Sequence, residues 1–116
     1  MWLPAYAHKR MLACMNDPVT ILSALAEPTR LAALRIVWDG RERCVCELVR
    51  DLGVTQSRMS RHMNILKTAG LVTGRRDAQW MRYSRASGLP PEVVALAEAA
   101  LAMMPPPTDM PEREAA

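Results

Sequence analysis

The feature that most constrains the fold is a short glycine turn between two segments with helical periodicity. The first segment covers residues 44–52 and ends at Gly53, and the second follows Thr55 and continues to about Ala69. Glycine commonly follows the last turn of a helix, and threonine often caps the first turn of the next one. A helix, a tight turn and a second helix in this order predict a helix-turn-helix motif.

Two further helices are predicted before this motif. Asp17 and Pro18 are typical of a helix start, because an N-cap acceptor precedes a proline at the first helical position. Glu27 and Pro28 open the second helix in a similar way. This helix is expected to end before a polar link over residues 41–43, which leads into the helix-turn-helix.

After the helix-turn-helix the periodicity changes to that of strands. Residues 71–76 and 80–84 favour two short strands, and residues 77–79 favour the tip of a hairpin between them. Two prolines then open a last helix, rich in alanine and leucine, over residues 92–103. The expected fold is mostly α-helical with a small β-hairpin, which describes a winged helix-turn-helix.

Length and composition fit one small domain. The chain has 116 residues, of which 50% are hydrophobic and none is phenylalanine, and the abundance of alanine and leucine favours helices. We expect an N-terminal arm or helix over residues 1–17. A single folded winged-helix domain is expected over residues 18–103, and a disordered, acidic and proline-rich tail over residues 104–116.

Several classes of protein are disfavoured. No apolar run reaches the length of a membrane span, and the N-terminus does not have the pattern of a signal peptide. Three cysteines, two of them separated by one residue, favour reduced thiols in the cytoplasm over a secreted disulfide framework. The sequence offers no nucleophile–base pair, phosphate loop or histidine-rich site, so an enzyme is not expected.

The net charge of +3 is unevenly distributed along the chain. Residues 53–85 carry seven basic side chains and a single acid, Asp77, whereas residues 86–116 are net acidic. A basic block of this kind is typical of a surface that contacts phosphates. From charge alone, a solvated polar face is the alternative, so the positions of the basic side chains must decide.

The second helix of the predicted motif has two different faces. When residues 57–70 are projected at about 100° per residue, Met59, Met63 and Leu66 fall together and form a stripe that faces the core. The opposite face carries short polar and arginine side chains, which suit the major groove of DNA. His62 lies at the border of the core stripe, so we expect a packed, hydrogen-bonded histidine and not a base reader.

Four arginines then lie on or beside the predicted hairpin, where a wing contacts the DNA backbone or the minor groove. These are Arg75, Arg76, Arg82 and Arg85. The side chains expected to contact DNA are Thr55, Gln56, Ser57, Arg58, Ser60, Arg61, Asn64, Arg75, Arg76, Gln79 and Arg82.

Four groups of residues together resemble one known family. They are residues 25–31 (Leu-Ala-Glu-Pro-Thr-Arg-Leu), 44–48 (Cys-Val-Cys-Glu-Leu), 60–66 (Ser-Arg-His-Met-Asn-Ile-Leu), and 75–77 with Trp80 and Tyr83. In this order and spacing they are similar to the arsenic-repressor (ArsR/SmtB) family over about residues 18–103. The resemblance implies a homodimeric winged-helix repressor that binds inverted repeats in operator DNA without metal and leaves them when metal binds. It also implies a dimer interface made by the N-terminal helix and the helix over residues 92–103.

The chain departs from this family at three places. Val49 stands where the arsenic-sensing members have a further cysteine, and Ala78 stands where the wing usually has a glycine. The last helix has no histidine and only two carboxylates, Glu92 and Glu98. The family's zinc site between the last helices is therefore not expected.

Cys44 and Cys46 are the central pair of the expected inducer site. In a regular helix, residues two apart point about 200° apart, so one ion is expected to reach both sulfurs only if the first helical turn loosens. The helix N-terminus, with Arg41 and Arg43 beside it, favours the thiolate form. The alternative is that both cysteines are small buried apolar residues.

A third thiolate is needed for trivalent arsenic or antimony, which bind three sulfurs. Cys14 is the only other thiol, and it is expected to reach the pair in its own subunit or, as the resemblance to cadmium- and lead-sensing members favours, in the partner. His8 is a candidate fourth ligand, which suits cadmium or zinc better than arsenic. No cofactor is expected besides the inducer.

Two alternatives remain open at this point. A cadmium- or lead-responsive repressor has the same fold and the same ligands. A thiol-redox-responsive repressor, in which Cys14 pairs with Cys44 or Cys46, uses the same activated thiolates.

Overall fold

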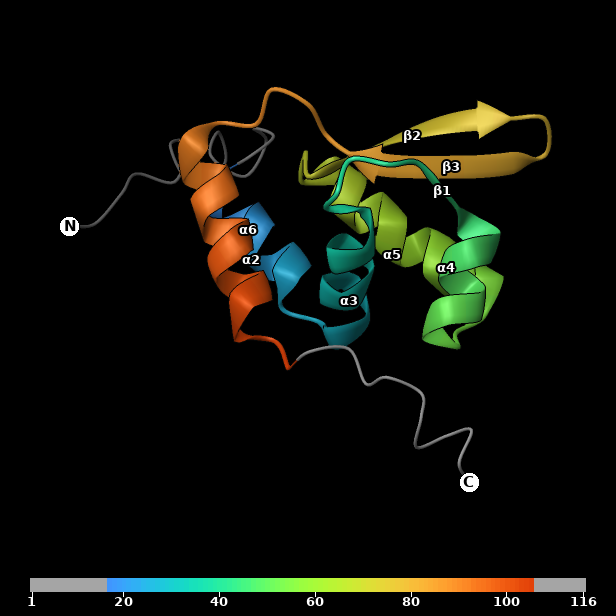
Figure 1. The fold of residues 1–116 in the computed structure, drawn as a ribbon, viewed down its shortest axis with the longest axis horizontal. Coiled ribbons are helices and arrows are strands. Elements are labelled where there is room, and N and C mark those ends of the chain that lie inside the picture. The colour runs from blue at the N-terminus through green and yellow to red at the C-terminus, as the bar shows by residue number, and fades with distance from the viewer. Residues whose placement is uncertain (1–16, 106–116) are drawn as a thin grey trace, which may run out of the picture.

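The computed structural model describes residues 17–105, and within this range it contains five helices and three strands (Figure 1). In chain order these are α2 (Pro18–Leu25), α3 (Pro28–Val37), β1 (Arg43–Cys44), α4 (Val45–Leu52), α5 (Gln56–Thr68), β2 (Val72–Asp77), β3 (Trp80–Arg85) and α6 (Pro91–Met103). The predictions for residues 1–16 and 106–116, including those for His8 and Cys14, lie outside the described residues. The expected winged helix-turn-helix is confirmed.

The predicted helix starts are confirmed by their capping hydrogen bonds. Asp17 Oδ1 accepts hydrogen bonds from the backbone N–H groups of Val19 at 2.9 Å and Thr20 at 3.1 Å, which satisfies donors that the first turn of α2 leaves free. Glu27 Oε1 accepts from the backbone N–H of Arg30 at 2.9 Å at the start of α3. These local contacts explain why the sequence predicted both helix starts correctly.

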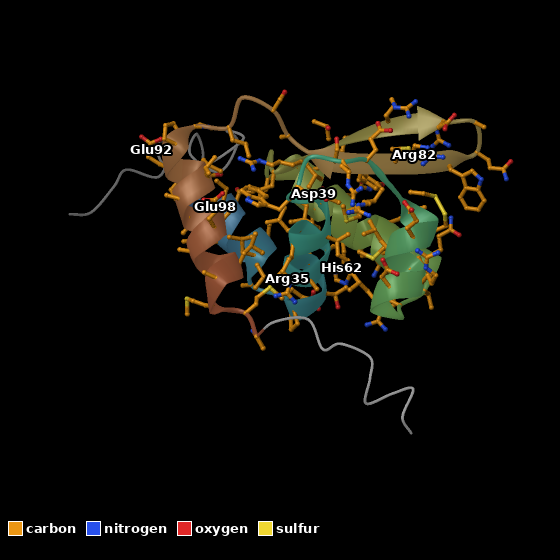
Figure 2. The ribbon with its side chains drawn as sticks, in the orientation of Figure 1. Arg35, Asp39, His62, Arg82, Glu92 and Glu98 are labelled. Carbon is orange, nitrogen blue, oxygen red and sulfur yellow. A yellow bond between two sulfur atoms is a disulfide. The ribbon has the colours of Figure 1, made fainter. Side chains whose placement is uncertain are left out.

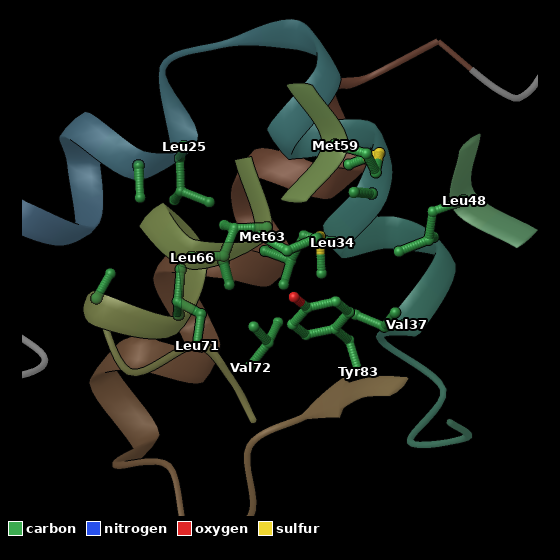
Figure 3. Close-up of a cluster of buried hydrophobic side chains, with 14 of the residues drawn as sticks. Leu25, Leu34, Val37, Leu48, Met59, Met63, Leu66, Leu71, Val72 and Tyr83 are labelled. Carbon is green, nitrogen blue, oxygen red and sulfur yellow. The ribbon is translucent and has the colours of Figure 1, made fainter. Parts of the chain in front are cut away.

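The helix-turn-helix consists of α4 and α5 around Gly53. The backbone of Gly53 has a φ of +69°, a left-handed conformation that glycine adopts without the steric cost of a side chain. Met59, Met63 and Leu66 of α5 are completely buried, as the periodicity predicted. Figure 3 shows these side chains packed with residues of α3, of α4 and of the sheet, so α5 is held in place by its apolar stripe.

The wing is a three-stranded antiparallel sheet with the strand order β1-β3-β2. The hairpin of β2 and β3 was predicted, but the third strand was not: Arg43 and Cys44 pair with Tyr83 and Arg82 of β3. The polar link predicted over residues 41–43 therefore ends one residue earlier, because Arg43 belongs to strand β1. A two-residue strand has no detectable periodicity, and its partner lies about 40 residues away in the chain.

The hairpin turn has an unusual residue at its tip. Ala78 has a φ of +58°, and it is the one residue other than glycine with a positive φ among the described residues. Positive φ places the Cβ atom close to the backbone, which is why glycine is preferred there. The turn therefore has, with an alanine at its tip, the backbone conformation that glycine favours.

At the end of the molecule opposite the hairpin tip, α6 lies beside α2 (Figure 1). Val93 and Ala97 of α6 are buried, and the indole N–H of Trp38 donates a 3.1 Å hydrogen bond to Glu98. Within residues 17–105, no helix combines the length and the hydropathy that crossing a membrane requires.

Candidate nucleic-acid interface and thiol site

The polar face of α5 is exposed, as predicted. Thr55 caps the helix, since its hydroxyl accepts a 3.3 Å hydrogen bond from the backbone N–H of Arg58. Ser60 is partly buried, whereas the other residues of the predicted face are exposed: Thr55, Gln56, Ser57, Arg58, Arg61 and Asn64. Arg61 and Asn64 also line a cleft of about 410 Å³ between α5 and α2. The exposed face can therefore enter a groove without displacing a core residue.

His62 is a packed histidine, as its position at the edge of the core stripe predicted. Its Nδ1 accepts a hydrogen bond of 3.2 Å from Arg30, and its side chain is 15% exposed. Arg30 also donates to the backbone carbonyls of Ala24 at 2.7 Å and Ser23 at 3.2 Å. Figure 2 shows His62 among the helices, where it connects α5 through Arg30 to α2 and α3.

The wing carries less free positive charge than its sequence suggests. Arg75 makes two hydrogen bonds of 2.8 Å to the carboxylate of Glu42, and these bonds hold the pKa of Glu42 below its usual value. Arg82, labelled on the hairpin in Figure 2, donates a 2.8 Å hydrogen bond to Asp77 at the end of β2. Sequence reasoning missed Glu42, because no local pattern connects residues 33 positions apart.

The other two arginines of the wing differ from each other. The guanidinium of Arg85 lies 3.9 Å from the centre of the Trp38 ring, a cation–π contact. Arg76 is exposed and makes no ion pair with any residue of the described chain. Arg76 is therefore the wing arginine whose charge is free for a phosphate, and DNA contact by the predicted residues stays a prediction.

Cys44 is the N-cap of α4 and not part of the helix. Its backbone is extended, and its sulfur accepts a hydrogen bond of 3.2 Å from the backbone N–H of Cys46. In return, Glu47 Oε1 accepts a 2.7 Å hydrogen bond from the backbone N–H of Cys44, which completes a capping box. The same cysteine therefore ends strand β1 and starts helix α4.

This position brings the two sulfurs together, and a disulfide joins Cys44 to Cys46 with a Cα–Cα distance of 5.1 Å. The expectation that the side chains point about 200° apart was wrong, because it assumed that both residues are helical. The expectation of reduced thiols also differs from this pairing. Since Cys44 precedes the helix, its sulfur turns toward the first turn of α4, and no loosening of the helix is needed.

The surroundings of the pair are uneven. Cys44 is 4% exposed, whereas Cys46 is exposed. Arg41 and Arg43 each donate a 3.1 Å hydrogen bond to Asp39, so their charges are paired with this carboxylate. Neither arginine therefore presents an unpaired charge to the two sulfurs.

The site provides some, but not all, of the ligands that a soft, thiol-seeking ion needs. Two sulfurs on one side of a helix start can bind the same ion, but over residues 17–105 no cluster of three metal-ligating side chains occurs. Val49, which stands where arsenic-sensing members of the family have a further cysteine, packs against the core. A third sulfur must therefore come from elsewhere, and the predicted donor, Cys14, lies outside the described residues.

Comparison with known proteins agrees with this architecture. Residues 27–73, from the start of α3 to the start of the wing, match the family described as "Bacterial regulatory protein, arsR family". The arsenic resistance transcriptional regulator ArsR1 of Pseudomonas putida is 36% identical over 101 residues, which are 87% of this chain and 75% of that protein. The match covers only 54% and 62% of the lengths of two further curated relatives.

Two solved structures are similar over most of the chain. The crystal structure of NolR from Sinorhizobium fredii has 31% sequence identity and a TM-score of 0.63, and the match covers 85% of this chain and 91% of NolR. A homodimeric winged helix-turn-helix DNA-binding domain from Mycobacterium bovis has 24% identity and a TM-score of 0.63, with 88% of each chain covered, and supports the fold alone. The relative from Pseudomonas putida is described as a transcriptional regulator. The chain belongs to the ArsR family of bacterial regulatory proteins.

Proposed function

We propose that this protein is a metal(loid)-responsive repressor that binds operator DNA as a homodimer and leaves it when trivalent arsenic or antimony binds Cys14, Cys44 and Cys46. The observation that carries the proposal is the position of Cys44, which caps the first helix of the helix-turn-helix and pairs with a wing strand. An ion bound to the sulfur of Cys44 is therefore attached to the helix-turn-helix and to the wing at the same time.

The names of relatives support an inducer of this chemical class. They include the arsenic resistance regulator of Pseudomonas putida and a probable mercury resistance operon repressor of Streptomyces lividans. Both elements are soft and prefer sulfur ligands. The pair of sulfurs at α4 supplies two of the three that trivalent arsenic needs, and Cys14 supplies the third. Cadmium or lead is the second candidate inducer, and His8 as a fourth ligand would favour cadmium over arsenic.

The operator is double-stranded DNA with an inverted repeat. The exposed face of α5 enters the major groove, and the wing contacts the backbone beside it. An inducer releases the DNA only to the extent that it binds the DNA-free form more tightly. Since Cys44 caps α4 and belongs to the wing sheet, a bond from its sulfur to an ion favours a different arrangement of these elements.

The homodimer is formed through α2 and α6. The exposed large hydrophobic side chains of the described residues include Val19 and Leu22 on α2, which are 47% and 52% exposed, and Met103 on α6, which is 85% exposed. A shallow cavity of about 210 Å³ lies between the two helices. Burial of this apolar surface against a second copy removes it from water.

A titration of DNA release tests the proposed function. Reduced protein bound to a fluorescent operator is titrated with arsenite, antimonite, cadmium, lead and zinc side by side, and anisotropy reports release. We expect arsenite and antimonite to release DNA at the lowest concentrations. Release by cadmium or lead instead favours the second candidate, and no release by any of the five contradicts an inducer of this class.

A further inference from the structure

We infer that Cys44 and Cys46 are a redox pair, and that their oxidation to a disulfide keeps the protein in its DNA-binding form while removing its response to the inducer. The second half of this inference rests on the proposed function. The observation behind it is that the disulfide coexists with an intact fold: α4 packs on α5, and β1 pairs with β3.

The geometry of the pair allows the bond without a change in the backbone. The Cα atoms are 5.1 Å apart, within the range of about 4.4–6.8 Å that disulfides span. This distance follows from the extended backbone of Cys44 as N-cap, with Cys46 in the first turn of α4. The two residues therefore meet within one rigid local structure, and no other segment has to move.

The difference in exposure sets the order of the reaction with a hydroperoxide. The exposed sulfur of Cys46 attacks the peroxide, so that a sulfur–oxygen bond forms while the oxygen–oxygen bond breaks and one molecule of alcohol or water leaves. The buried sulfur of Cys44 then attacks the sulfur of Cys46. The sulfur–sulfur bond forms, the sulfur–oxygen bond breaks, and the departing hydroxide takes the proton of Cys44 to give water. The two thiols lose two electrons and two protons, and the peroxide is reduced.

The contacts that organise the DNA-binding elements do not need a free thiol. In the disulfide-bonded pair, the sulfur of Cys44 still accepts the 3.2 Å hydrogen bond from Cys46, and the backbone N–H of Cys44 still donates to Glu47. Glu42 remains paired with Arg75 of the wing. The helix cap and the wing sheet are therefore complete, and operator affinity is retained.

The inducer response is lost for a chemical reason. A soft ion binds thiolates, and a disulfide offers no thiolate. Two of the three proposed ligands are removed at once, and Cys14 alone cannot hold the ion. Peroxide therefore makes the repressor unresponsive instead of releasing it from DNA, which is the opposite of a redox-responsive repressor that leaves its operator on oxidation.

Peptide mapping tests the pairing. Trypsin cleaves after Arg43 and Arg50, so both cysteines lie in one peptide, residues 44–50. After treatment of the full-length protein with hydrogen peroxide, this peptide should lose the mass of two hydrogen atoms and regain it with a phosphine reductant. A cross-linked pair of peptides that contains Cys14 would instead show a different disulfide and overturn the assignment.

Operator binding of the oxidised protein tests the consequence. We expect its affinity to lie within about twofold of that of the reduced protein, and arsenite to cause no release until a phosphine is added. A phosphine is used because dithiol reductants bind arsenite themselves. Peroxide-treated protein that leaves the operator without arsenite overturns the inference, as does oxidised protein that still responds to arsenite.

A matched variant separates this inference from the proposed function. Cys46→Ser cannot form the disulfide, so peroxide should leave its peptide of residues 44–50 without the loss of two hydrogen atoms. Reduced wild-type protein that ignores arsenite contradicts the proposed function alone, because the peptide mass and the operator affinity after oxidation are measured without arsenite. A wild-type peptide that keeps both thiols contradicts the redox pair alone.

Discussion

At the scale of single residues, Cys44 combines roles that are usually divided among several side chains. Its backbone pairs with β3, its N–H bonds to Glu47, and its sulfur both caps α4 and meets Cys46. A sulfur is a weak hydrogen-bond acceptor compared with the oxygens that usually occupy an N-cap. A cysteine therefore stabilises the start of α4 less than the usual capping residues do, but it provides the thiolate that the proposed inducer needs.

Two substitutions of Cys44 separate its capping role from its ligand role. Cys44→Ser keeps an acceptor for the backbone N–H of Cys46, whereas Cys44→Ala removes it. In the presence of a reductant, we expect Cys44→Ala to lower the free energy of unfolding by about 0.5–2 kcal/mol relative to Cys44→Ser. Urea unfolding measures this difference, and both variants should be unresponsive to arsenite. Equal stability of the two variants would show that the sulfur does not cap the helix.

The tip of the wing offers a second test at this scale. Because Ala78 has a φ of +58°, Ala78→Gly should relieve steric strain that exceeds the entropic cost of glycine. We expect a gain of about 0.5–1 kcal/mol in the free energy of unfolding, measured with urea. Gln79→Gly is the matched control, since Gln79 has no positive φ and the substitution should destabilise the hairpin. A loss of stability in both variants would contradict the assignment of the turn.

At the scale of elements, the local signals of the sequence were sufficient for the helices but not for the third strand. Asp17, Glu27 and Gly53 act through contacts within a few residues, so their effect can be predicted from neighbours in the chain. Strand β1 exists because β3 lies beside it, and the pairing of Glu42 with Arg75 depends on the same contact.

The start of α4 shows how a small boundary error changes a functional argument. The sequence predicted a helix that begins at Cys44, whereas α4 begins one residue later and Cys44 is its N-cap. Cysteine is not a usual capping residue, so no local signal corrected the boundary. With Cys44 in the helix the two sulfurs diverge, and with Cys44 before the helix they meet. The role of the two cysteines as the sensing pair stays a prediction, and the sequence did not predict the geometry of the pair.

The pairing of wing arginines predicts how operator binding depends on salt. Arg76→Ala should reduce the slope of log affinity against log salt by about 2, because each subunit of the proposed dimer loses one phosphate contact. Arg75→Ala should change the slope less, since Glu42 already neutralises Arg75. Glu42→Gln should raise both the affinity and the slope by releasing Arg75. Fluorescence anisotropy of an operator over a salt series measures these slopes, and equal slopes for Arg75→Ala and Arg76→Ala would contradict the account of the wing.

At the scale of the whole molecule, the apolar surface of α2 predicts the assembly. Leu22 is 52% exposed, so Leu22→Glu should leave the folded protomer intact while placing a charge in the proposed interface. Sedimentation should give a dimer for the wild type and a monomer for Leu22→Glu, with a lower affinity for an operator that contains two half-sites. Gln79→Glu, a change at an exposed position of the wing tip, should remain dimeric. A wild-type protein that sediments as a monomer would refute the dimer.

The proposed dimer raises the question of which subunit's Cys14 completes each thiol pair. We expect Cys14→Ser to need much more arsenite for release, because the loss of one thiolate removes one of three bonds to the ion. Release at the wild-type arsenite concentration would favour a two-cysteine site completed by an outside thiol such as glutathione.

A mixed dimer decides between ligation within a subunit and across the dimer. A Cys14→Ser chain keeps Cys44 and Cys46, and a Cys46→Ser chain keeps Cys14, so neither homodimer has a complete set of three thiolates. If Cys14 acts across the dimer, co-expression of the two chains with different tags yields a heterodimer with one complete site, and arsenite binding returns at half the wild-type stoichiometry. If Cys14 acts within its own subunit, each site of the heterodimer still lacks one sulfur. Purification over both tags followed by an arsenite titration distinguishes the two, and we expect binding to be restored.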